Sequence, residues 1–270
     1  FLLKKTIQFI AKNNALPPGE EIFLHYKKLY KIDSPIIPLI YIIKVLIPVI
    51  FKFLYIKVSS SRKTYWSIAF SKFDGFKTSL FRYKEIKNPP NRFFADPFIY
   101  SKNNRSIIFV EDYSFKKRKG EISAIEVTNG YVKHLGIVIS EDFHLSFPFV
   151  FEYDSELYMM PETSQIREIR IYKCQEFPTK WKLHKTIMNN VSAADNMMIC
   201  RDNSYFLLSN ICSAKQDDHD SELHIFHSKN PFSDTWKPLA CGNPVIFDPL
   251  KSRNGGVIFC GEKIYRINQK

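Results

Sequence analysis

The chain reads Ala-Asp-Pro-Phe-Ile-Tyr at residues 95–100 and, after a turn, Ser-Ile-Ile-Phe-Val-Glu at residues 106–111. Two apolar runs rich in β-branched and aromatic residues, joined by a turn, are typical of paired antiparallel strands. The same design recurs in three more places, which start at Phe147, Asp195 and Asn254. Counted from Asp96, the successive starts are 51, 48 and 59 residues apart. An all-β repeat of this period is typical of the four-stranded blades of a β-propeller.

We therefore predict an all-β fold, a five-bladed β-propeller whose last blade is incomplete, preceded by a short helical, apolar segment. The predicted domains are the helical segment, residues 1–60, and the propeller, residues 61–270. The strand near Trp66 is expected to supply outer strands ahead of the first blade. A Pro lies shortly before both Trp181 and Trp236, which indicates the same outer-strand turn. We interpret all three tryptophans as packing residues.

The N-terminal segment is basic and strongly apolar. Residues 36–56 read IIPLIYIIKVLIPVIFKFLYI, about the length of a membrane span. Lys44 and Lys52 interrupt the run, and charge is costly in the middle of a bilayer, so a spanning helix is disfavoured. Two interpretations remain open: peripheral membrane contact through residues 36–57, with the lysines reaching the polar surface, or a buried helix packed on the propeller.

The net charge is +12, with a pI near 9.3. This balance fits a negatively charged partner such as an anionic membrane face or a nucleotide-sugar, and it fits equally a solvated basic surface. No nucleic-acid motif accompanies the charge, so we expect no nucleic-acid partner. The five cysteines form no CxxC pair, which favours a cytoplasmic location, at the inner face of the membrane. We expect no cofactor and no metal site, and we interpret the run Asp217–Asp220 as a solvated loop.

Four runs in the repeat resemble the propeller domain at the N-terminus of glucosamine inositolphosphorylceramide transferases. They are Arg92–Phe98, Phe109–Tyr113, His144–Phe151 and Met160–Thr163. The resemblance covers roughly residues 64–270, and the fold is in turn similar to the five-bladed glycoside hydrolases. It implies a carbohydrate-handling propeller in cell-surface polysaccharide or glycolipid biosynthesis, with a glycan, glycolipid or nucleotide-sugar as partner. In the plant enzymes the assigned transferase chemistry belongs to a separate C-terminal domain.

The first strand of each propeller blade lines the central channel, so the polar starts of the repeats are expected to gather at one mouth. Glycosyl chemistry uses two carboxylates, one ionised and one protonated. The likeness to the hydrolases implies Asp96 as base or nucleophile, Glu162 as acid and Asp195 as the group that tunes their pKa. Phe147-Pro148 departs from the Asp-Pro expected in one blade. The candidates for substrate binding are Glu111, Asp112, His144, Ser146 and Arg253.

Each candidate also has a structural interpretation, because an Asp before Pro can cap a turn and an acid at a strand end can face solvent. Three functions stay open: glycosyl transfer, hydrolysis by a five-bladed glycoside hydrolase, and a non-catalytic scaffold or glycan-binding propeller. Both enzymatic hypotheses require Asp96, Glu162 and Asp195 to meet at one mouth of the channel.

Overall fold

The computed structural model describes residues 7, 10–13, 15, 36–51, 65–71, 80–102, 105–128, 130–212 and 218–269. The chain divides into two units, Phe1–Lys63 and Thr64–Lys270. In the first unit, α2 (Ile36–Tyr41) continues through a π-helical turn, η1 (Ile42–Leu46), into helical residues 47–51. The side chains described in this helix are exposed. Among the described residues, no helix has the length and apolar character needed to cross a membrane.

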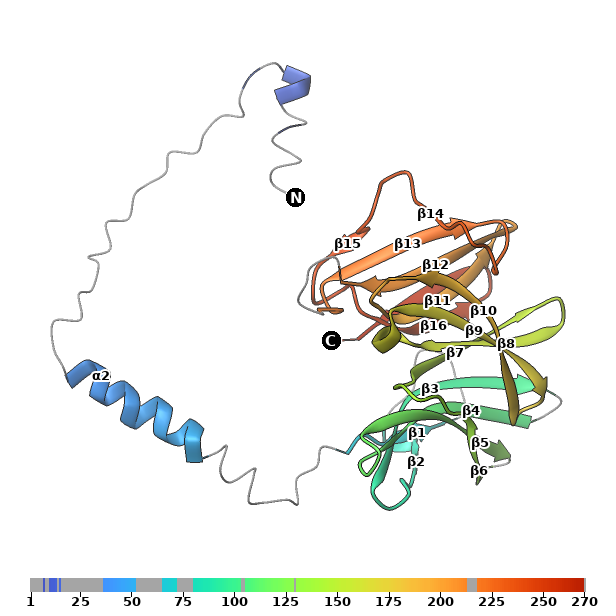
Figure 1. Cartoon of the computed structure of the whole chain (residues 1–270), viewed down its shortest axis with the longest axis horizontal. Coiled ribbons are helices and arrows are strands. Elements are labelled where there is room, and N and C mark those ends of the chain that lie inside the picture. The colour runs from blue at the N-terminus through green and yellow to red at the C-terminus, as the bar shows by residue number, and fades with distance from the viewer. Residues whose placement is uncertain are drawn as a thin grey trace. The chain divides into compact units, whose positions relative to one another are not determined.

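The second unit consists of antiparallel strands in five sheets across its described residues (Figure 1). The N-terminal sheet contains β1 (Ile68–Phe70) and β2 (Lys84–Ile86), and the C-terminal sheet contains β16 (Asn254–Cys260) and β17 (Lys263–Asn268). Blade A contains β3 (Arg92–Lys102), β4 (Arg105–Ser114), β5 (Lys119–Thr128) and β6 (Tyr131–Ile139). Blade B contains β7 (Ser146–Tyr153), β8 (Glu156–Glu162), β9 (Glu168–Glu176) and β10 (Lys180–Asn189). Blade C contains β11 (Ala193–Arg201), β12 (Ser204–Ile211) and β13 (Glu222–Ser228), with β14 (Lys237–Pro238) and β15 (Ile246–Phe247) both paired to β13. Two single 3₁₀ turns, η2 (Leu80–Arg82) and η3 (Ser164–Ile166), join strands.

A β-bulge marks the start of the first strand in each blade. In blades A, B and C the pairing register shifts at Asp96, Phe147 and Asp195, whose φ angles are +47°, +46° and +48°. The three residues predicted to be equivalent therefore share one unusual backbone conformation. In the C-terminal sheet the shift lies between Asn254 and Gly256. Asn254 lies two residues before Gly256, the first residue paired beyond the shift, just as Asp96, Phe147 and Asp195 do in their strands, so it holds the equivalent position as predicted.

Apolar side chains fill the spaces between successive sheets. One cluster joins the N-terminal sheet to blade A through residues such as Ile68, Ile86 and Phe94. A second joins blades A and B, and a third, which includes Phe147 and Met197, joins blades B and C. Because strands that alternate apolar side chains on both faces must be covered on both faces, the sheets pack face to face.

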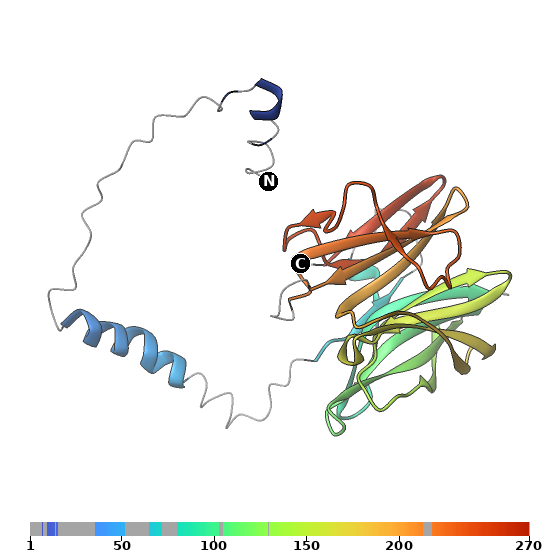
Figure 2. The same ribbon diagram turned by 45° about the horizontal axis from the view of Figure 1, so that its top comes forward.

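This packing places the first strands side by side in the order β1, β3, β7, β11 and β16. The turned view in Figure 2 shows the red strands of the C-terminal sheet beside the orange strands of blade C. The all-β, propeller-like arrangement is therefore present. Among the described residues no strand pairs the N-terminal sheet with the C-terminal sheet. The complete five-bladed ring stays a prediction.

Candidate functional site

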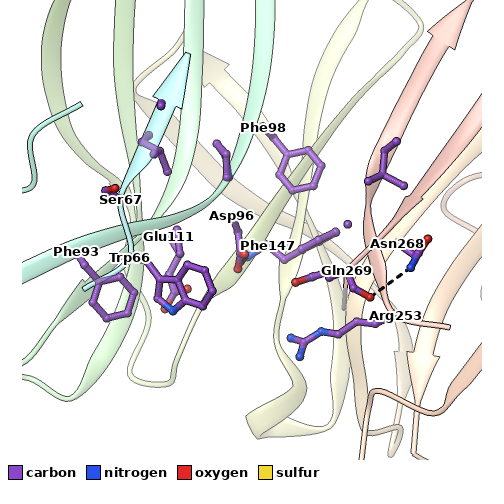
Figure 3. A pocket seen from close by; sticks show the side chains of 16 residues that line it. Trp66, Ser67, Phe93, Asp96, Phe98, Glu111, Phe147, Arg253, Asn268 and Gln269 are labelled. Atoms are coloured by element: carbon purple, nitrogen blue, oxygen red, sulfur yellow. Dashed lines mark hydrogen bonds between the residues drawn. The ribbon is translucent and has the colours of Figure 1, made fainter. Parts of the chain in front are cut away.

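A pocket of about 670 Å³ lies at the starts of the first strands. Its wall comes from the N-terminal sheet, from β3, β4 and β7, and from both strands of the C-terminal sheet. Its charged side chains are Asp96, Glu111 and Arg253. Figure 3 shows Asp96 in the middle, with Glu111 on one side and Arg253 and Gln269 on the other. The volume lies within the range of small-molecule sites.

Asp96 occupies the bulge of β3, in a left-handed conformation that Asp tolerates better than most residues. Its Oδ2 accepts a hydrogen bond from the backbone N–H of Phe147 at 3.3 Å, so it also ties blade A to blade B. Burial raises the pKa of Asp96, and the charge of Glu162 raises it further. The Phe147 N–H and Arg253 act in the opposite direction.

Glu162 ends β8, where it is paired with Ser146. Its Oε1 accepts a hydrogen bond from Ser164 Oγ at 2.7 Å, and its Oε2 accepts one from the backbone N–H of Asp195 at 3.3 Å. Glu162 therefore ties blade B to blade C. It is absent from the residues that form the pocket wall, although it repels Asp96, Glu111 and Asp195 strongly enough to raise their pKa values.

Asp195 is 1% exposed, in the bulge of β11. Its Oδ2 lies 2.7 Å from Arg253 Nε and 3.3 Å from Gln269 Nε2. Arg253 also contacts Asp220 Oδ1 through Nη1 at 2.9 Å. Burial and the charge of Glu162 raise the pKa of Asp195 to about 7, because together they outweigh the opposing effect of Arg253. Near neutral pH the protonated and ionised forms of this carboxyl group are therefore both populated.

Glu111 is a wall residue and forms a pair with His144. His144 Nδ1 accepts a hydrogen bond from the backbone N–H of Gly120 at 2.9 Å, and its Nε2 lies 3.5 Å from Glu111 Oε1. Burial lowers the pKa of His144, which favours the neutral ring with its proton on Nε2. Burial, followed by the charges of Asp96, Glu162 and Asp112, raises the pKa of Glu111 to about 8. Both members of the pair are therefore uncharged at neutral pH.

The structure brings most of the predicted site residues together, with one exception. Asp96, Glu111 and Arg253 form the wall, while Glu162, Asp195, His144 and the buried Ser146 adjoin them. Asp112 lies on the other face of β4, where it contacts Arg92 Nε at 2.6 Å and accepts a hydrogen bond from Ser123 Oγ at 2.7 Å. These contacts line a separate cavity of about 270 Å³.

Besides Gln269, the wall residues that the sequence analysis missed include Trp66. The prediction that it is a packing residue is wrong, because its side chain is 63% exposed and lines the pocket. The packing prediction suits the other two tryptophans: Trp181 packs edge-on against Phe109 at 5.5 Å, and Trp236 packs on the cluster between blades B and C. A signal was available, since Trp66 is the one tryptophan without a Pro shortly before it.

The described residues contain no group of three or more His, Cys, Asp or Glu side chains arranged to hold a metal ion. In the acidic run, Asp218 accepts hydrogen bonds from the Asp220 N–H and from Ser221 Oγ, and Asp217 lies outside the described residues.

The fold belongs to a class of propeller-like all-β folds that includes a family-43 glycoside hydrolase. A GH43 β-1,3-galactosidase matches with a TM-score of 0.55 at 12% identity, over 73% of this chain and 45% of that one. An exo-β-1,3-galactanase from Clostridium thermocellum matches with a TM-score of 0.52 at 12% identity, over 63% of this chain and 40% of that one. At this identity the likeness concerns the fold alone.

Residues 80–270 match the family described as glucosamine inositolphosphorylceramide transferase 1, N-terminal, and the chain belongs to this family. Glucosamine inositolphosphorylceramide transferase 1 of Arabidopsis thaliana is 34% identical over 185 residues, which are 67% of this chain and 24% of the plant protein. The protein of the same name from Oryza sativa subsp. japonica is 32% identical over the same shares. The chain thus spans about a quarter of the length of these relatives. The resemblance inferred from the sequence is confirmed.

Proposed function

We propose that the pocket binds a saccharide and that the chain serves glycosyl transfer in glycolipid or cell-surface polysaccharide biosynthesis. The observation that carries the proposal is the gathering of acidic side chains from blades A, B and C around one open pocket: Asp96, Glu111, Glu162 and Asp195. The names of the plant relatives, which specify the sugar glucosamine and the lipid inositolphosphorylceramide, support it.

The chemistry of the wall suits a sugar. Carboxyl groups accept hydrogen bonds from hydroxyls, and the exposed ring of Trp66 offers apolar area to the C–H face of a pyranose. Asp96 and Glu111 supply carboxyl groups with different proton affinities, because the pKa of Glu111 is raised to about 8 while the Phe147 N–H and Arg253 limit the rise at Asp96. Such a pair is what acid–base chemistry at a glycosidic bond requires.

Arg253 points to the second kind of group the partner could carry. Its guanidinium lies in the wall of the pocket, where Nε and Nη1 are bonded to carboxylates. A phosphate of a nucleotide-sugar or of a glycolipid headgroup would be attracted to this residue. We therefore propose a glycan, glycolipid or nucleotide-sugar as the ligand, and no nucleic acid.

A binding screen tests the proposal. The wild-type chain and the Asp96→Asn, Glu162→Gln double variant are compared on a glycan array and on a panel of nucleotide-sugars. The matched control is Asp202→Asn with Glu262→Gln, which removes the same charge at two exposed acids outside the pocket wall. We expect the site variant to lose about tenfold or more in affinity, as loss of charged hydrogen bonds does. No saccharide binding by the wild type, or equal binding by both variants, contradicts the proposal, and equal binding supports the scaffold hypothesis.

A five-bladed glycoside hydrolase is the second candidate function. The elevated pKa of Glu111 favours it, because a carboxylic acid that keeps its proton at neutral pH can protonate a leaving group. Incubation of the wild type with oligosaccharides of the sugar that binds, followed by a reducing-end assay, separates the two candidates. Hydrolysis in water without an acceptor supports the hydrolase, and transfer to an added acceptor supports the transferase.

We further propose a cytoplasmic location with peripheral membrane contact through residues 36–57, of which residues 52–57 lie outside the described part of the chain. The helix from 36 to 51 is exposed along its described side chains and carries one charge, at Lys44. Co-sedimentation with phosphatidylserine vesicles tests this contact. We expect an Ile43→Glu, Ile47→Glu variant to remain in the supernatant, whereas Ile43→Leu, Ile47→Leu sediments like wild type. Equal sedimentation of both variants contradicts it.

A further inference from the structure

Side chains from the second strands tie successive sheets together in a repeated way. In blade B, Glu162 accepts the backbone N–H of Asp195 in the next blade at 3.3 Å. In blade C, Asn210 Oδ1 accepts the backbone N–H of Asn254 in the C-terminal sheet at 2.8 Å. Both residues hold the same register position, opposite the residue that precedes the bulge. This position is therefore a structural link between sheets.

Glu111 holds that position in blade A, opposite Ala95, but makes a different contact. The N–H that would be its partner belongs to Phe147, and Asp96 Oδ2 already accepts it. The Glu111 carboxyl group lies in the pocket wall instead, on the same side as Trp66 and Phe93 (Figure 3). Glu162, with both oxygens accepting hydrogen bonds, is not a wall residue.

His144 and Gly120 fix the place of the Glu111 carboxyl group. His144 Nδ1 accepts a hydrogen bond from the Gly120 N–H, so the ring proton is on Nε2, which lies toward Glu111 Oε1. A Cβ on residue 120 would lie 2.4 Å from the Leu145 carbonyl oxygen and 2.9 Å from both Glu111 Oε1 and His144 Cε1. Only glycine at position 120 leaves room for the Glu111 carboxyl group and the His144 ring to lie this close to the backbone.

The charged groups around Glu111 keep a proton on it. Asp96, Glu162 and Asp112 all repel its ionised form, burial disfavours that form as well, and His144 is neutral. Glu162, by contrast, has both oxygens engaged as acceptors, from Ser164 Oγ and from the Asp195 N–H.

We propose that Glu111 is the proton donor of this pocket and that His144 is the residue that positions it. The inference rests on the proposed function and moves the acid role from Glu162 to Glu111. In the reaction, the O–H bond of Glu111 breaks and its proton passes to the bridging oxygen of a glycoside. The bond from that oxygen to the anomeric carbon breaks, and the oxygen keeps the electron pair. A hydroxyl of water or of an acceptor sugar bonds to the anomeric carbon and gives its proton to Asp96.

Leaving-group dependence tests the assignment. The probes are phenyl and 2,4-dinitrophenyl β-glycosides of glucosamine, glucose and galactose, because the dinitrophenolate departs without protonation. We expect Glu111→Gln to lose about a hundredfold or more in kcat/KM on the phenyl glycoside and less than about tenfold on the dinitrophenyl one. Glu162→Gln is expected to affect both probes by the same factor. Equal losses in Glu111→Gln, or leaving-group dependence in Glu162→Gln, overturn the proposal.

His144→Asn tests the positioning role. Asn keeps an acceptor for the Gly120 N–H but does not reach Glu111. We expect a lower kcat on the phenyl glycoside with KM unchanged, and a basic limb of the pH–rate profile shifted to higher pH, because ionised Glu111 loses an N–H donor. An unshifted basic limb overturns the role. Saccharide binding by the wild type is measured alongside: binding without turnover of any probe overturns the acid role alone, and absence of binding also overturns the proposed function.

Discussion

Asp195 contacts an arginine at 2.7 Å, and its pKa is still raised to about 7. At the scale of single residues, the reason is desolvation: a carboxylate that is 1% exposed loses its hydration, and the neighbouring Glu162 adds repulsion. Burial and like charge also raise the pKa of Glu111, which is 7% exposed and has a neutral His144 in place of an arginine, to about 8. Burial and like charge thus set the protonation of the site.

The elevated pKa of Glu111 predicts how stability changes with pH. The folded protein holds this proton up to about pH 8, whereas the unfolded chain releases it near the ordinary value of 4.5. Between these values the folded state binds more protons, so the free energy of unfolding falls as pH rises. We expect the melting temperature to fall less between pH 5 and pH 8 in Glu111→Gln than in wild type. Thermal melts of wild type, Glu111→Gln and the control Glu262→Gln, an exposed position, measure the melting temperature across this range. The same dependence of melting temperature on pH in all three proteins contradicts the prediction.

Gly120 predicts a steric effect at the same site. Gly120→Ala would place a methyl group 2.4 Å from the Leu145 carbonyl oxygen and force apart the Glu111–His144 pair. We expect a loss of about 1–3 kcal/mol in the free energy of unfolding, as overpacking causes, measured by urea denaturation. Gly255→Ala is the control: a Cβ there would lie 3.3 Å from its nearest atoms, in Gln269, so we expect a smaller loss in the free energy of unfolding. An unchanged free energy of unfolding in Gly120→Ala would mean that the backbone at this position moves to accept the methyl group.

At the scale of elements, the bulged first strand is the unit that repeats. The bulge turns its first residue into a left-handed conformation, which places Asp96 and Asp195 at the acidic cluster. Blade B keeps the bulge but has Phe147 there, a bulky residue for which this conformation is strained. Phe147 is 2% exposed and packs against Phe98 at 4.7 Å between ring centroids. The same backbone thus serves a polar site in two blades and the core in the third.

Phe147 allows packing and strain to be separated. Phe147→Ala should lower the free energy of unfolding by about 3–5 kcal/mol through lost packing. Phe147→Gly removes one more carbon but relieves the strained φ of +46°, so we expect it to be no less stable than Phe147→Ala. Urea denaturation checks the order. Phe259→Ala, at an exposed position, serves as control. A glycine variant clearly less stable than the alanine variant would show that the strain is small.

At the scale of the whole molecule, the second unit is held by apolar layers between sheets and by polar links near the pocket. Asn210 is the buried link to the C-terminal sheet: its Nδ2 donates to the Ser252 carbonyl at 2.9 Å, and its Oδ1 accepts the Asn254 N–H. Arg253 and Gln269 from the same sheet reach Asp195. The C-terminal sheet therefore completes the pocket, and Asn254 Nδ2 adds hydrogen bonds to the Asp195 and Leu208 carbonyls of blade C.

Loss of the Asn210 link should loosen that sheet. Asn210→Ala removes the acceptor of the buried Asn254 N–H, which costs about 1–3 kcal/mol, while the Ser252 carbonyl keeps its hydrogen bond from Arg266. We expect faster amide hydrogen exchange in residues 254–268 and little change in blade A, measured by mass spectrometry. Asn189→Ala, at an exposed position of β10, is the control. Unchanged exchange in the C-terminal sheet would show that its other contacts, such as Arg253 with Asp195, hold it without Asn210.

Much of the fold was predictable from the chain itself. The strands and turns follow from local propensity and from the alternation of apolar residues, and the repeat follows from the spacing of Asp96, Phe147 and Asp195. All of these features depend on residues that are close together or regularly spaced along the chain. The sequence set Trp66 apart from the other two tryptophans, but its place in the pocket wall was not predictable in this way, because that place depends on which sheets stand around it.

The sequence by itself determined the all-β repeat, its period and the acids that stand at the repeat starts, because these depend on neighbours along the chain. Only the tertiary structure decided which acid faces the pocket. Glu111 and Glu162 hold the same register position, and they differ because Asp96 takes the N–H of the following blade from one of them and not from the other. That choice depends on a contact across 51 residues of chain, which local pattern does not encode.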